Sequence, residues 1–114
     1  MMKAEFGIIE NIEETRQYSY DPEKYHCVSI DDDIYIDDWW DELVLLKTYF
    51  HSLDRPEFGL ARWGITLIPP ESLPAFQEIV LSDRRINEDV HLGELADQIQ
   101  DAVSRNKYMI HFGV

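Results

Sequence analysis

Only one cysteine, Cys27, occurs among the 114 residues, so the chain can form no internal disulfide bond. This cysteine usage is typical of proteins in a reducing compartment. Long apolar runs are also missing, and none approaches the roughly 18 residues of a membrane-spanning helix. The N-terminal residues include an acidic side chain as early as Glu5 and contain no long apolar run, unlike a secretory signal. By elimination, we expect a soluble cytoplasmic protein.

Motifs that carry chemistry are equally scarce. None of the four histidines belongs to an HExxH motif, and His26 and Cys27, as neighbours on a predicted strand, point to opposite faces. Ser72 and Ser82 stand outside any nucleophile-elbow pattern, and the glycines are too scattered for a phosphate-binding loop. The basic cluster at residues 83–85 is too small for a nucleic-acid-binding surface. We therefore predict no catalytic residue, no cofactor and no metal site, and a protein that is not an enzyme.

Acidic residues, by contrast, dominate the composition. The chain has 23 Asp and Glu against 10 Lys and Arg, a formal net charge of −13. The acid is densest in residues 31–42, which read DDDIYIDDWWDE: seven carboxylates, no basic residue and the aromatic side chains Tyr35, Trp39 and Trp40. Such a field repels nucleic acid and anionic membranes and attracts basic proteins. We expect a basic protein as the partner, and neither nucleic acid nor a membrane.

Three interpretations of this acidic segment are open. The first is a solvated turn and helix start, because runs of charge are usually plain surface. The second is a docking surface, on which carboxylates steer a basic partner while Trp40 and Tyr35 provide buried anchors. The residues that this second interpretation assigns to partner binding are Asp31, Asp32, Asp33, Tyr35, Asp37, Asp38, Trp40 and Asp41.

Calcium binding is the third interpretation, and the residue spacing tests it. An EF-hand loop starting at Asp31 would have suitable ligands at its third position, Asp33, and its twelfth, Glu42. Tyr35 and Ile36, however, occupy the fifth and sixth positions, where a ligand and a glycine are needed. A small metal-dependent enzyme or regulator that uses the carboxylates of residues 31–42 therefore stays only an alternative.

The hydrophobic pattern predicts a single α+β domain. Apolar and β-branched stretches predict four strands, at residues 4–12, 25–30, 60–68 and 108–112. Helices are predicted at residues 37–53, from residue 70 with Pro74 in the first turn, and at residues 92–106. We expect one four-stranded mixed or antiparallel sheet with about three helices packed on it, in a strand order that the pattern leaves open.

The first of these helices depends on one apolar stripe. Its members recur at spacings of three and four residues, and they are Trp39, Leu43, Leu46, Phe50 and Leu53. Because each residue of a helix turns about 100°, Trp40 falls on the flank of this stripe, toward the acidic side. Trp39 is therefore expected in the core and Trp40 near the surface.

Three parts of the chain resemble known proteins: residues 55–72 (RPEFGLARWGITLIPPES), the DDWWDE segment and the C-terminal strand KYMIHFGV. Together they are similar to small acidic bacterial immunity proteins of toxin–immunity systems. The resemblance implies a cytoplasmic protein that binds and blocks one toxin domain, often a basic nuclease. The physical argument is independent of it: a toxin that grips nucleic acid presents Lys and Arg to phosphates, and a carboxylate-rich inhibitor can cover that surface.

A homo-oligomeric structural subunit is a further alternative. It would associate through an exposed edge strand such as residues 108–112. Like-charge repulsion at −13 per chain opposes such association unless the contact avoids the acidic face.

Overall fold

One antiparallel sheet forms the centre of the computed structural model, which describes residues 2–13 and 17–113. Its six strands are β1 (Lys3–Ile9), β2 (Val28–Asp31), β3 (Lys47–Phe50), β4 (Pro56–Phe58), β5 (Ile65–Ile68) and β6 (Tyr108–Gly113). They lie in the order β2-β1-β6-β5-β3-β4, and every neighbouring pair is antiparallel. The predicted α+β class and the single sheet are confirmed, but the sheet has six strands, not four.

Three α-helices accompany the sheet. A π-helical turn, η1 (Asp32–Ile36), leads directly from β2 into α1 (Asp37–Leu43). A short 3-10 turn, η2 (Pro70–Ser72), opens α2 (Leu73–Leu81), and α3 (Val90–Arg105) follows. Pro74 lies in the first turn of α2, as predicted, where the missing N–H costs no hydrogen bond. Asp89 caps α3 by accepting a hydrogen bond from the His91 backbone N–H, and Asn106 ends it in the left-handed conformation.

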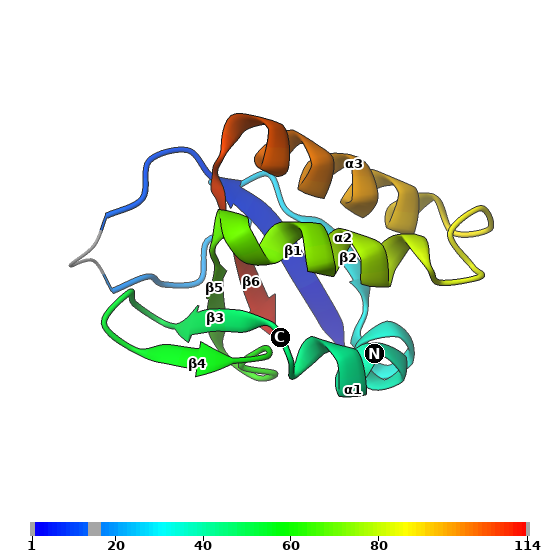
Figure 1. Cartoon of the computed structure of the whole chain (residues 1–114), viewed down its shortest axis with the longest axis horizontal. Coiled ribbons are helices and arrows are strands. Elements are labelled where there is room, and N and C mark those ends of the chain that lie inside the picture. The colour runs from blue at the N-terminus through cyan, green and yellow to red at the C-terminus, as the bar shows by residue number, and fades with distance from the viewer. Residues whose placement is uncertain (1, 14–16, 114) are drawn as a thin grey trace.

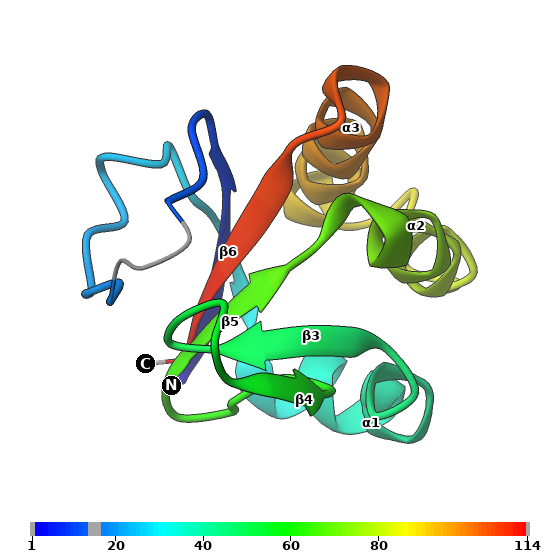
Figure 2. The ribbon, with the colours of Figure 1, turned by 60° about the vertical axis from the view of Figure 1, so that its left-hand side comes forward.

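The two faces of the sheet are covered differently. Figures 1 and 2 show α2 and α3 on one face, and the long connection between β1 and β2 on the other. Alternation along β6 divides its side chains accordingly: Met109 packs in the helix-side core, while Ile110 and Phe112 pack against Tyr18 and Tyr25 of the connection. Tyr20, from the same connection, lies edge-on to Phe112 at 5.1 Å between ring centroids.

The helix expected at residues 37–53 is wrong over its second half. It ends at Leu43, and residues 47–50 instead form β3, which pairs with both β4 and β5. Its apolar stripe is split between the two cores: Leu46 stays on the helix side, whereas Leu53 packs on the other face of the sheet. The Thr-Tyr-Phe sequence suits a strand, and pairing with β5 prevails over the helical spacing.

The C-terminal strand also corrects an expectation. β6 lies between β1 and β5 and is hydrogen-bonded on both sides, so residues 108–112 form no edge. The edge strands are β2 and β4. Strand order therefore excludes association through residues 108–112, and a homo-oligomer through the edge strand β2 or β4 stays an untested prediction.

Candidate partner-binding surface

The acidic segment forms η1 and α1, which lie together at one end of the molecule beside the end of β4 (Figure 1). Asp31 begins it as a helix cap, accepting a hydrogen bond of 3.2 Å from the Ile34 N–H to its Oδ1. Asp37 and Asp38 lie in the first turn of α1, where carboxylates interact favourably with the helix dipole. The segment is thus ordered by local interactions that its own acid supplies.

Arg62, from the turn before β5, neutralises part of this acid. Its Nε and one terminal nitrogen donate to Asp32 Oδ2 at 3.0 and 2.9 Å, and the guanidinium also pairs with Asp37. Burial disfavours the charge on Arg62, but the hydrogen bonds to Asp32 and Asp37 outweigh that effect and raise the pKa of Arg62. The guanidinium lies 5.5 Å from the Trp40 ring centroid and 5.3 Å from that of Trp63, so it interacts with both indoles.

Arg85, between α2 and α3, makes a second set of contacts. It pairs with Asp83 at 2.7 Å and with Asp38 at 2.8 Å, and lies 4.7 Å from the ring centroid of Tyr35. Asp83 also accepts a 2.8 Å hydrogen bond from Trp39 Nε1. The hydrogen bonds from Arg85 hold the pKa of Asp83 well below its usual range. The acidic segment is thereby tied to the loop between α2 and α3.

Two of the predicted contact residues are not at the surface. Asp32 is fully buried beneath Arg62, and its Oδ1 has no partner among the described residues. Tyr35 is buried as well, and its hydroxyl donates a 2.6 Å hydrogen bond to Asp89. Burial and this hydrogen bond raise the pKa of Tyr35 to about 12. Neither side chain is accessible to a partner, so the assignment of Asp32 and Tyr35 to partner binding is corrected.

The other predicted residues differ in how free they are. Asp37 and Asp38 are exposed but already paired with arginines, and Asp31 is half-buried in its cap. Asp33 and Asp41 are exposed, and within the described part of the chain their carboxylates make no hydrogen bond or ion pair. Glu42, which was not assigned to partner binding, is in the same condition. Trp40 is half-buried against Arg62, as expected for a residue on the flank of α1.

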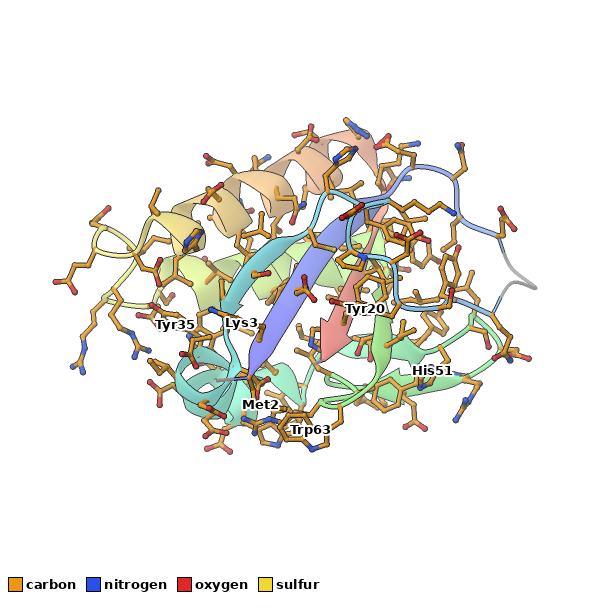
Figure 3. All side chains as sticks on the ribbon, turned by 180° about the vertical axis from the view of Figure 1, so that it is seen from behind. Met2, Lys3, Tyr20, Tyr35, His51 and Trp63 are labelled. Carbon is orange, nitrogen blue, oxygen red and sulfur yellow. The ribbon has the colours of Figure 1, made fainter. Side chains whose placement is uncertain are left out.

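Three residues of this surface were not predicted from the sequence: Arg62, Arg85 and Trp63. The arginines reach the segment from positions 30 and 47 residues away along the chain, and no local pattern signals such a pairing. Trp63 is exposed, and Figure 3 shows it at the lower edge of the molecule, pointing away from the sheet. Arg62 and Trp63 were expected inside the strand predicted at residues 60–68, but residues 60–64 form a turn before β5, so no sequence pattern pointed to either residue.

The single thiol and the groups that could bind a metal ion lie away from this surface or are not clustered in the part of the chain that the structure describes. Burial, with contributions from Glu5 and Asp21, raises the pKa of the Cys27 thiol to about 12, so it is protonated near neutral pH. Over residues 2–13 and 17–113, no three His, Cys, Asp or Glu side chains are placed to hold a metal ion. The same residues contain no helix with the length and apolar character needed to cross a membrane. Comparison with family models, curated proteins and solved structures found no match for this chain.

Proposed function

We propose that this protein is an acidic protein-binding module, an immunity-type inhibitor that neutralises a basic toxin or effector domain. The proposal rests on the carboxylates that stay unpaired after Arg62 and Arg85 have formed their ion pairs within the protein. Arg62 and Arg85 pair with Asp32, Asp37 and Asp38, yet Asp33, Asp41 and Glu42 still present free carboxylates in the same segment.

Electrostatic steering gives this surface a physical use. A net charge of −13 on a small domain raises the encounter rate with cationic proteins and opposes contact with nucleic acid. A nuclease or other nucleic-acid-binding effector must expose Lys and Arg to phosphates, and that cationic surface is what free carboxylates complement. The sequence resemblance to immunity proteins of toxin–immunity systems favours an inhibitor over other acidic binding proteins.

The test compares two triple variants of equal charge. Asp33→Asn, Asp41→Asn and Glu42→Gln remove the free carboxylates of η1 and α1, whereas Glu23→Gln, Glu71→Gln and Asp97→Asn remove exposed carboxylates elsewhere. Each variant changes the net charge from −13 by three, to −10. Each is immobilised and used at low ionic strength to capture proteins from the native host, with captured proteins identified by mass spectrometry.

We expect the unmodified protein and the Glu23/Glu71/Asp97 variant to capture the same proteins, with isoelectric points above about 9. The Asp33/Asp41/Glu42 variant should lose them, because the carboxylates that face the partner are gone. Equal capture by both variants would show that the acidic segment is merely solvated surface. Circular dichroism spectra of all three proteins should coincide, since the substituted side chains are exposed.

A further inference from the structure

Exposed apolar side chains gather where α1 and β4 end. Leu45 is 77% exposed, Phe58 64%, Trp63 62% and Val44 38%, and Trp40 is half-buried beside them. We call these five residues, Trp40, Val44, Leu45, Phe58 and Trp63, the apolar corner. Small proteins rarely leave large apolar side chains together at the surface unless something covers them.

Contacts recorded in the structure link the members of the apolar corner. Trp40 and Trp63 both contact the Arg62 guanidinium. Val44 follows Trp40 by one helical turn, and its backbone N–H donates to the Trp40 carbonyl at 3.1 Å. Val44 also packs on Gly59: a Cβ added to Gly59 would lie 3.2 Å from the Cα of Val44. Phe58 directly precedes Gly59 in the chain. In both Figure 1 and Figure 2 the end of β4 lies beside the end of α1.

Charged side chains border the apolar corner. Asp37 and Asp41 lie beside Trp40 on α1, whereas Glu42 lies on the Asp38 side of that helix, and Glu57, opposite Thr48, lies on the other face of β4 from Phe58. Two cations also border the corner: Arg62, already paired with Asp32 and Asp37, and Lys47, which is opposite Phe58 across the β3–β4 ladder. The corner therefore has a charged margin, on a chain whose net charge is −13. A centre of exposed aromatic and aliphatic side chains within a charged margin is the usual anatomy of a protein-binding hot spot.

We propose that the apolar corner is the contact centre of the interface, and that it binds apolar side chains set within a cationic surface of a partner protein. This inference rests on the proposed function and specifies it: the partner must present hydrophobic residues among its Lys and Arg, not charge alone. The net charge of −13 steers the partner toward this chain, and desolvation of Phe58, Trp63 and Leu45 slows its release.

Charge complementarity favours such a partner over a second copy of this chain. A symmetric dimer through the apolar corner would bring Asp41 of both copies to one interface. Like charges brought together cost free energy, and each chain already carries −13. A cationic partner surface avoids this electrostatic repulsion, whereas self-association increases it.

Two short peptides of equal length and charge test the inference at low ionic strength by calorimetry. In one, lysine alternates with leucine; in the other, lysine alternates with serine. We expect the lysine–leucine peptide to bind about tenfold more tightly, because it adds apolar burial to the same charge. Backbone amide NMR shifts should place it on residues 40–45 and 57–63.

A matched pair of variants shows whether the apolar corner is responsible. The variant Leu45→Ser with Phe58→Ser should bind both peptides alike, whereas Leu81→Ser with Val90→Ser, which removes apolar side chains that are 48% and 71% exposed elsewhere, should keep the preference. Equal affinity of the two peptides for the unmodified protein would overturn the inference alone. So would loss of the preference in the Leu81/Val90 variant. If neither peptide bound, the proposed function would fall with it.

Discussion

His111 is the most unusual single residue outside the acidic face. It is fully buried on β6, where its Nδ1 lies 3.1 Å from Thr66 Oγ1 and its ring centroid lies 5.0 Å from that of Phe6. Thr66 Oγ1 accepts a hydrogen bond from the Ala61 N–H, so its own proton is available to the imidazole. Burial lowers the pKa of His111 to about 3. The folded protein therefore holds this imidazole neutral.

The free energy of unfolding should consequently decrease as the pH falls below about 6.5, the pKa of an unfolded histidine. Below that pH the unfolded chain binds a proton at His111. The folded chain binds this proton only near pH 3, because the pKa of His111 in the folded protein is about 3. Between pH 7 and pH 5 the loss attributable to His111 is about 2 kcal/mol. Urea unfolding at the two pH values measures it.

His111→Phe provides the comparison, because it removes the titrating group and keeps an aromatic ring beside Phe6. We expect the pH dependence between pH 7 and pH 5 to shrink by most of that amount in the variant. Carboxylates contribute little in this window, since an unfolded Asp titrates near pH 4. An unchanged pH dependence would mean that His111 is protonated in the folded protein.

At the scale of elements, the register of α1 separates its two tryptophans. Trp39 is buried and donates to Asp83, whereas Trp40 is half-buried and contacts Arg62 from the surface side. Trp39→Ala should lower the free energy of unfolding by about 3–5 kcal/mol, as other large-to-small core changes do. Trp40→Ala should cost much less. Equal losses in urea unfolding would show that the two side chains are buried alike.

Elements whose signals are local were predicted well. α3 has a capping aspartate, a regular apolar stripe and a left-handed residue at its end, and β1 and β6 are apolar runs. The region after α1 was not predictable in this way, because Trp39, Leu43 and Leu46 have helical spacing whether or not the helix continues. Only pairing with β5, which is distant in sequence, decides that residues 47–50 form a strand.

The residues of the candidate site could likewise be predicted only where local sequence determines their position. Trp40 and Asp41 follow from the local register of α1, and the structure leaves both accessible. The burial of Asp32 and Tyr35 depends on Arg62 and on Arg85 with Asp89, which come from other parts of the chain. A buried carboxylate needs a partner, and a single sequence does not say which arginine provides it.

For the molecule as a whole, the sheet carries helices on one face and places the acidic segment beside the end of β4 (Figure 2). Internal arginine pairs order that segment without cancelling its charge. The consequence is a surface on which free carboxylates and exposed apolar side chains lie in neighbouring elements. Its partner should be recognised first through charge and then held through apolar contact.

The most direct test of this account is the association rate constant with the captured basic protein, measured by stopped-flow tryptophan fluorescence as a function of salt concentration. Attraction between oppositely charged surfaces predicts that the rate constant falls at least about tenfold from low to high salt, because ions screen the field. The dissociation rate constant should change far less. An association rate constant that does not depend on salt, or a protein that binds no cationic partner at low ionic strength, would contradict the account.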